Sequence, residues 1–303
     1  MKSLLIILFL AISTGVMAQV TTTDSLFNSM SSDKQHGPVT IFESPRLILT
    51  QSTEMLKKKN MNLVFIHRFG DFAGDLGGGR TLFGLDAIAD VYIGFQYGIT
   101  DNLNVDFGRS TLPNGGGLVS GQLKYALMHQ TADDSSPLAI SLLGMAGVRP
   151  YNAYNSFGDR VSYFAQALFA RKITHSFSLQ VAPSILYDNQ PDPNVPGNEN
   201  AIFSVSATAK LKVTKLMSIV VDYAHPFSSF RNNNAGYSDP LGAGIQVVTG
   251  GHVFTLNISN ARAINEMNYL ANSGSDFGRG QYRLGFTISR TFDFTHKEKY
   301  NPK

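Results

Sequence analysis

The chain has 303 residues, of which 43% are hydrophobic and 16% charged, and its formal net charge at pH 7 is +3. So small a net charge argues against a dedicated nucleic-acid-binding surface. The absence of cysteine excludes disulfide bonds, and it argues against a lipoprotein because acylation needs a cysteine at the signal-cleavage site.

The first residues have the three parts of a secretory signal. Lys2 is the positively charged start, Leu4–Ile12 is the apolar core, and Val16–Ala18 is a small-residue cleavage site. The apolar core is too short for a membrane-spanning helix, and no later stretch reaches about 18 consecutive apolar residues. We therefore predict a signal peptide over residues 1–18, with a buried N-terminal helix as the alternative.

The stretch after the signal lacks a clear pattern. Residues 19–37 are rich in Thr and Ser, and we predict a periplasmic leader over residues 19–45. Within and after this leader, Pro38–Ser44 and Arg46–Gln51 are short extended segments separated by Pro45.

From Met61 onward, apolar and polar residues alternate. Val91–Ile99 places Val, Ile, Phe, Tyr and Ile on one face and Tyr, Gly, Gln and Gly on the other. Because side chains alternate between the two faces of a strand, each such segment has one apolar and one polar face. Behind an export signal, the pattern predicts an all-β fold, an antiparallel up-and-down transmembrane β-barrel in the outer membrane with a polar lumen. The predicted strands are Met61–Phe69, Val91–Ile99, Leu103–Arg109, Leu118–His129, Pro137–Val148, Arg160–Ile173, Phe177–Asp188, Ala201–Val213, Met217–His225, Gly242–Val248, His252–Ser259 and Gly280–Phe294.

A glycine-rich segment and a helical pattern separate the first two strands. Gly70–Arg80 is followed by Leu82, Leu85 and Ala89, which recur at helical spacing. We predict a short helical segment near residues 81–90, over the barrel mouth or inside the lumen.

The connections alternate in length, apart from a mid-length one at residues 130–136. Turns of about two to four residues alternate with loops of about ten or more, which are typical of periplasmic turns and outer loops respectively. The barrel then covers residues 46–294, with both of its ends and a tail at residues 295–303 in the periplasm. It has about twelve strands, or about fourteen if residues 38–55 add one hairpin.

Most charged residues of the strands lie on the polar face. A basic side chain facing lipid at mid-depth costs roughly 2–4 kcal/mol, so the polar face belongs to the lumen. Arg290 lies on the apolar face, near the periplasmic end, where its side chain can reach the interface. The lumen-facing or gating candidates are Arg68, Asp86, Asp106, Arg109, Lys124, Lys210, Lys212, Asp222 and Arg283.

A soluble β-sandwich or lipocalin-like barrel, with its apolar face inward, also alternates. The predicted strands favour the membrane because they match the ~9–11 residues of a membrane-spanning strand rather than the ~5–6 of globular sheets. Aromatic residues near strand ends suit interfacial girdles.

The sequence shows no catalytic or metal-binding pattern. Its seven histidines are scattered without metal-ligand spacing, and there is no Gly-x-Ser-x-Gly motif. Gly77–Thr81 lacks the Lys-Ser/Thr ending of a phosphate-binding loop. We therefore predict no enzyme activity, no cofactor and no metal.

The last strand indicates how the protein is assembled. Tyr282, Phe286, Phe292 and Phe294 share its apolar face. It resembles the C-terminal strand by which the barrel-assembly machinery recognises outer-membrane proteins, although here residues 295–303 follow it. The predicted partners are this machinery and outer-membrane lipid.

Several motifs together resemble a family of outer-membrane β-barrels, domain of unknown function 5777. The resemblance covers about residues 40–294 and implies the barrel and its location, but it implies no substrate and no catalytic residues. It is carried by His67–Asp71, Phe83–Asp86, Tyr97–Leu103, Gly108–Ser110 and Leu123–Tyr125. Val105–Phe107 is more acidic than the family pattern.

Two functions remain open. The first is a channel or transporter for small solutes, and the alternative is a non-transporting barrel that serves as an anchor or partner in an envelope assembly. We also hypothesise that Arg68 or Arg109 pairs with Asp86 and fixes the predicted helical segment in or over the lumen, so that the barrel is plugged.

Overall fold

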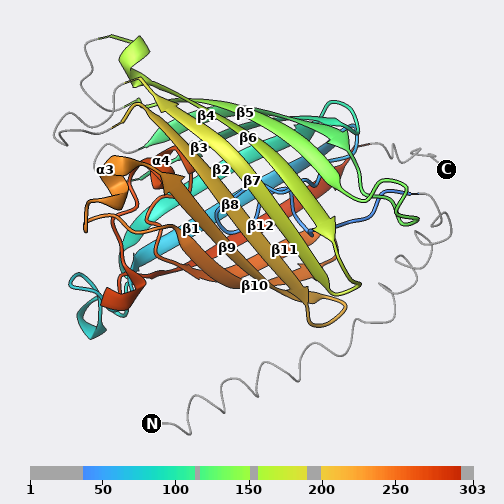
Figure 1. The fold of residues 1–303 in the computed structure, drawn as a ribbon. Helices are drawn as coiled ribbons and strands as arrows, with labels where there is room; N and C mark the ends of the chain where they lie inside the picture. The colour runs from blue at the N-terminus through green and yellow to red at the C-terminus, as the bar shows by residue number, and fades with distance from the viewer. Residues whose placement is uncertain (1–36, 113–116, 151–155, 190–198, 295–303) are drawn as a thin grey trace, which may run out of the picture.

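The structure, a computed structural model, describes residues 37–112, 117–150, 156–189 and 199–294. In these residues twelve antiparallel strands pair in sequence order, and β1 pairs with β12 to close a barrel (Figure 1). The predicted up-and-down barrel is confirmed, with twelve strands rather than fourteen. They are β1 (Asn60–Asp71), β2 (Ile88–Gly98), β3 (Leu103–Ser110), β4 (Leu118–Met128), β5 (Ala139–Val148), β6 (Val161–Lys172), β7 (Phe177–Asp188), β8 (Ala201–Lys212), β9 (Met217–Phe227), β10 (Leu241–Thr249), β11 (His252–Ser259) and β12 (Arg283–Asp293).

The wall has an apolar outer face and a largely polar inner face. In β3, Phe107 is 60% exposed on the outside, whereas its neighbour Asp106 is 7% exposed inside the barrel. Leu123 of β4 and Leu256 of β11 are likewise exposed outward. So continuous an apolar outer surface is suited to lipid chains rather than to water.

Short helices lie only in the loops of the described chain. They are α3 (Ser229–Asn232), α4 (Glu266–Ala271) and the 3-10 turns η1 (Gly79–Thr81), η2 (Gly158–Arg160) and η3 (Phe277–Arg279). Among these helices, none has the length and apolar character that a membrane-spanning helix requires.

The helical segment predicted near residues 81–90 is not an α-helix. Only η1 is helical there, and Leu82, Phe83 and Gly84 have φ angles of 46°, 56° and 81°. Three successive left-handed residues cannot continue a right-handed helix. The backbone turns back instead, and Gly70 N–H donates to the Gly84 and Ala87 carbonyls at 2.9 Å each.

Residues 38–55 add no strands to the wall. They form only the isolated bridges Pro38↔Thr131 and Arg46↔Gln51, and they run inside the barrel. Residues 41–45 of the predicted leader therefore lie in the lumen, whereas Pro38 and Thr40 are exposed at the barrel end. The predicted signal peptide, the leader up to residue 36 and the tail at 295–303 lie outside the described residues.

Two wall glycines make room for an aromatic ring on the inner face. Tyr92 lies against Gly94 and Gly108, and a Cβ at position 108 would be 2.1 Å from the Tyr92 hydroxyl oxygen. The Arg46 guanidinium lies over the same ring, 5.3 Å from its centroid. The two glycines therefore allow the wall to hold a tyrosine against the chain in the lumen.

Substituting Gly108 tests this close approach. We expect Gly108→Ala to reduce the free energy of unfolding by about 1–3 kcal/mol through overpacking, measured by thermal unfolding in detergent micelles. Gly144→Ala is the matched control, since a Cβ there meets open space. Equal losses in the two variants would contradict the expectation.

Candidate functional site

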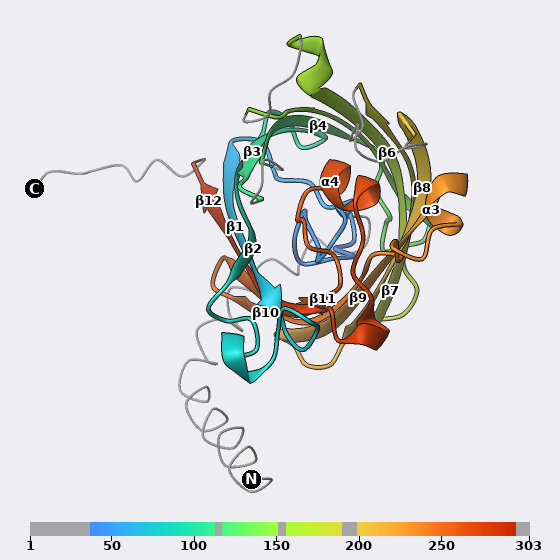
Figure 2. The same ribbon diagram turned by 90° about the vertical axis from the view of Figure 1, so that its left-hand side faces the viewer.

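Two segments of the chain fill the lumen. We call residues 38–56 the N-terminal plug and residues 260–275 the loop plug. Figure 2 looks into the barrel through the end that carries the long loops and shows the blue N-terminal plug and α4 of the loop plug inside the ring of strands. All six residues of α4 are buried, and so are Leu47, Ile48 and Leu49.

The two plugs come from opposite ends of the barrel. The N-terminal plug starts and finishes at the end with short turns, where Val39 N–H donates to the Gln130 carbonyl and Lys59 N–H to the Gly98 carbonyl, each at 2.8 Å. The loop plug joins β11 to β12 at the end with long loops. The lumen is therefore closed by two insertions that meet inside it.

A buried ion pair joins the plugs where they meet. Arg46 Nη1 lies 3.2 Å from Glu266 Oε1, and the two side chains are 2% and 0% exposed. Arg46 Nη2 also donates to the Ile264 carbonyl at 2.7 Å, and Gln51 donates to Glu266 at 3.2 Å. The Tyr269 hydroxyl donates to the Leu49 carbonyl at 3.2 Å. Each plug therefore satisfies polar groups of the other.

Apolar side chains seal the same region. The tip of the N-terminal plug and the loop plug form one buried cluster with the inner face of the wall. Its largest members are Ile48, Leu49, Leu118, Leu143, Met145, Phe164, Leu186, Ile202, Met267, Tyr269 and Leu270. The lumen at this level is packed like a protein core.

Arg68 of β1 fastens both plugs to the wall. Its guanidinium donates to the Ala261 carbonyl at 3.0 Å, to the Ala263 carbonyl, and to the Ile48 carbonyl at 3.1 Å. The side chain is 1% exposed. One wall residue thus satisfies carbonyl oxygens in both inserted segments. Arginine can do this because its guanidinium carries five N–H donors.

Lys124 of β4 fastens the N-terminal plug alone. Its Nζ donates to the carbonyls of Pro45, Ser52 and Glu54 at 3.4, 3.1 and 2.8 Å. The side chain is 1% exposed. The ammonium group therefore supplies hydrogen-bond donors to three backbone oxygens of a segment that is not part of any strand.

Two wall carboxylates satisfy plug N–H groups. Asp222 Oδ2 accepts from Leu49 N–H at 2.8 Å, and Asp90 Oδ2 accepts from Ile264 N–H at 2.8 Å. Asp90 also accepts from the Ser110 hydroxyl at 2.8 Å. Backbone groups of both plugs are thus paired with ionisable side chains of the wall, as burial of polar backbone requires.

Of the other inward candidates, Lys210 and Arg283 contact a plug, whereas Asp106 is paired within the wall. Lys210 Nζ lies 3.2 Å from Glu43 Oε1, and Asp106 accepts from the amides of Gln96 and Gln122. Arg283 pairs with Asp71 at 2.5 Å and donates to the Asn260 carbonyl at 2.8 Å, so it anchors the start of the loop plug. Lys212 lies at the end of β8 and is half-buried.

The predicted pairing of Asp86 with Arg68 or Arg109 is wrong. Asp86 is exposed in the loop around η1, which projects beyond the long-loop end of the wall (Figure 1). Arg109 is exposed on the outer face of β3, next to Phe107 in the outward register, so it does not face the lumen. The η1 loop cannot fold inward because β1 and β2 tie its two ends to the rim, while other segments occupy the lumen.

Several residues of this network were missed by the sequence analysis. Arg46, Asp90 and Glu266 are each at most 3% exposed and carry charges. A signal for the loop plug was present, since Ala261, Ile264, Met267, Tyr269 and Leu270 are more apolar than a solvent-exposed outer loop needs to be. No local pattern indicated their partners.

Comparison with known proteins identifies one matching family and several solved structures of similar fold and low sequence identity. A family model described as a membrane bound beta barrel domain (DUF5777) matches residues 42–292. No curated protein matches the chain. Solved structures with a similar fold include the NanC porin, at 7% identity and a TM-score of 0.48, covering 77% of this chain and 100% of that one. The outer membrane protein Omp33 of Acinetobacter baumannii matches at 10% identity and a TM-score of 0.42, covering 78% of this chain and 99% of that one.

Proposed function

The chain belongs to the family of membrane-bound β-barrel domains, and from this premise we propose that it is a gated channel for small polar solutes in the outer membrane. In the proposal, the N-terminal plug and the loop plug hold the channel closed, and separation of the two plugs opens it. The single observation that supports the proposal most is that the lumen is closed by two separate insertions joined across a buried Arg46–Glu266 ion pair.

The size and lining of the barrel support this function. Side chains nearly fill the interior of an eight-stranded barrel, so a barrel of about twelve strands needs additional chain to be closed. The inner wall carries polar side chains along most strands, such as Ser120 and Gln122 on β4 and Ser204 and Ser206 on β8. Such a wall suits water and polar solutes once the plugs have separated.

A non-transporting barrel that anchors an envelope assembly is the second candidate function. The apolar cluster around Ile48, Leu49 and Tyr269 favours it, because a packed core resists opening. The two candidates differ in whether weakening the contact between the plugs produces a current.

Conductance of the refolded protein in planar bilayers tests the proposal. Removing one partner of a buried ion pair costs about 3–5 kcal/mol. We therefore expect Arg46→Ala, and the milder Glu266→Gln, to raise the open probability at least about 10-fold. Arg279→Ala, which removes an exposed arginine at the rim, is the control and is expected to leave the conductance unchanged. Folded Arg46→Ala and Glu266→Gln barrels that stay closed would favour the anchoring function and overturn the channel.

The proposal includes lipid and the barrel-assembly machinery as partners, and it includes no catalytic step. Leu284, Phe286 and Phe292 follow the outward register of β12, in keeping with an assembly signal in the last strand. Among the described residues, no three His, Asp or Glu side chains gather as a metal site would require.

A further inference from the structure

Three lysines of the inner wall lie together at the short-turn end of the barrel, and we call them the lysine patch. Lys172 ends β6, and Lys210 and Lys212 lie at the end of β8. Ser178 of β7 lies between Lys172 and Lys210 and is opposite both in the register. Because neighbouring strands are about 4.8 Å apart, the backbones of Lys172 and Lys210 are separated by about 10 Å. The three ammonium groups therefore share one part of the lumen.

The wall carries no acidic partner for the lysine patch. In the described strands β6, β7 and β8, the one acidic residue is Asp188, which lies at the long-loop end. Asp222 lies in the middle of the neighbouring strand β9, where it accepts from Leu49 N–H. Asp106 lies on β3, where its charge is compensated by that of Lys124. Negative charge for the patch must therefore come from elsewhere.

The N-terminal plug supplies this negative charge. Glu43 Oε1 lies 3.2 Å from Lys210 Nζ. Glu43 and Glu54 also lie within electrostatic reach of Lys172. Neither Lys172 nor Lys212 forms an ion pair with any residue of the described chain. In the closed lumen, three ammonium groups thus face two carboxylates of the plug, and the plug occupies the place that an anion would take.

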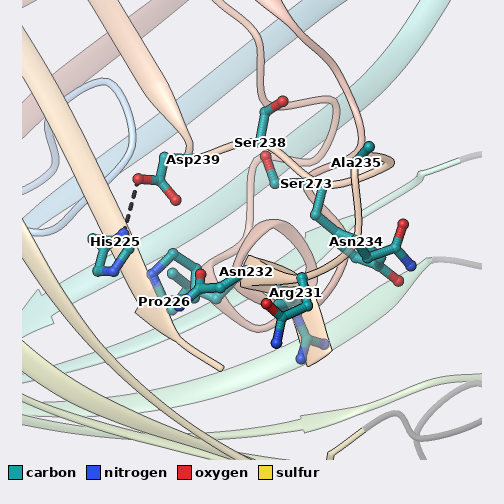
Figure 3. A pocket seen from close by; sticks show the side chains of 12 residues that line it. His225, Pro226, Arg231, Asn232, Asn234, Ala235, Ser238, Asp239 and Ser273 are labelled. Carbon is teal, nitrogen blue, oxygen red and sulfur yellow. Dashed lines mark hydrogen bonds and ion pairs between the residues drawn. The ribbon is translucent and has the colours of Figure 1, made fainter. Parts of the chain in front are cut away.

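The long-loop end of the barrel is balanced without the plugs. Figure 3 shows the cavity there, in which Asp239 accepts from His225 Nδ1 at 2.9 Å. Arg149 and Asp188 form an ion pair at 2.7 Å. Neither pair includes a plug residue, so both can persist when the plugs separate. At the short-turn end, by contrast, departure of the N-terminal plug removes both plug carboxylates and leaves the lysine patch facing the lumen.

We propose that the lysine patch is a binding site for the carboxylate group of an anionic solute, which replaces Glu43 when the N-terminal plug leaves the lumen. The proposal names the solute class of the proposed channel and rests on that function. Each lysine is a compact positive charge with three donors, and grouped lysines in a pore attract anions and repel cations. Solute and plug therefore compete for the same ammonium groups.

Replacing the plug carboxylate by a free one tests the site in the full protein in detergent micelles. At constant ionic strength, exchange of chloride for acetate should raise the melting temperature of Glu43→Ala by about 2–4 °C more than that of the wild type, because Glu43 already fills the patch in the wild type. Glu43→Ala/Lys210→Met should lose this effect. Glu43→Ala/Lys58→Met, which removes an exposed lysine at the same end, is the matched control and should keep it.

Ion selectivity of the opened channel tests the same lysines during conduction. In Arg46→Ala, the variant expected to open, a KCl gradient across a planar bilayer should give a reversal potential of the sign set by chloride. Adding Lys172→Met and Lys212→Met should reduce the ratio of chloride to potassium permeability at least about 3-fold. Adding Lys58→Met should leave that ratio unchanged.

The two measurements separate the site from the channel. An equal acetate effect in Glu43→Ala and the wild type, or an effect that persists without Lys210, would overturn the site. A conducting channel without anion preference would also overturn it and would leave the channel function standing. Stabilisation of Glu43→Ala by acetate in a barrel that never conducts would retain the site and reject the channel.

Discussion

Arg68→Leu is expected to release both plugs from the wall while the barrel itself persists. The substitution removes the guanidinium that donates to Ile48 in the N-terminal plug and to Ala261 and Ala263 in the loop plug. Hydrogen bonds to a charged group are each worth about 1.5–3 kcal/mol, and the three carbonyls would lose their buried donor. We expect the closed state of the lumen to lose at least about 3 kcal/mol.

Hydrogen–deuterium exchange in micelles measures this release. Amides of residues 38–56 and 260–275 should exchange at least about 100-fold faster in Arg68→Leu, since 1.4 kcal/mol corresponds to a factor of ten. The strand amides of β6–β9 should keep their protection, because they pair with one another and not with the plugs.

Arg109→Leu is the control for this experiment. Arg109 has the same charge but is exposed on the outer face of β3. Its loss should leave the exchange of both plugs unchanged. If the two variants exchanged alike, or if Arg68→Leu left the plugs protected, Arg68 would not be the residue that fastens them.

Lys124→Met is expected to free the N-terminal plug alone. Methionine keeps most of the length of the side chain but cannot donate to the carbonyls of Pro45, Ser52 and Glu54. The buried carboxylate of Asp106 also loses a neighbouring cation. The expected cost to the closed state is about 3–5 kcal/mol, as for a buried charge left without its partner.

The measurement is limited proteolysis of protein refolded in micelles, followed by mass spectrometry. Cleavage should appear within residues 38–56 and remain absent from residues 260–275, whereas Arg68→Leu should expose both segments. Lys58→Met, which replaces an exposed lysine two residues after the N-terminal plug, is the control and should resist cleavage. Cleavage of both plugs in Lys124→Met would mean that they open as one unit.

The wall was predictable because its pattern is local. A strand between lipid and lumen must alternate apolar and polar side chains. The outward position of Phe107 and the inward position of Asp106 could therefore be predicted from residue type alone. The predicted strand containing Lys124 matches β4 to within one residue, and Thr100–Asn102 forms the turn between β2 and β3. The prediction that Arg109 faces the lumen was wrong because β3 is short. Its last outward position lies near the rim, where a charge is tolerated on the lipid side.

What fills the lumen was decided by tertiary structure. Arg46 and Glu266 are separated by 220 positions in the chain, and no periodicity links residues so far apart. Residues 41–53 follow no period because the wall and the loop plug surround nearly all of them. The sequence by itself determined a membrane barrel with a polar interior, since one face of every strand must meet hydrocarbon. Only the three-dimensional structure decided that the barrel is closed, since closure depends on buried charges of the wall meeting backbone groups of two distant segments.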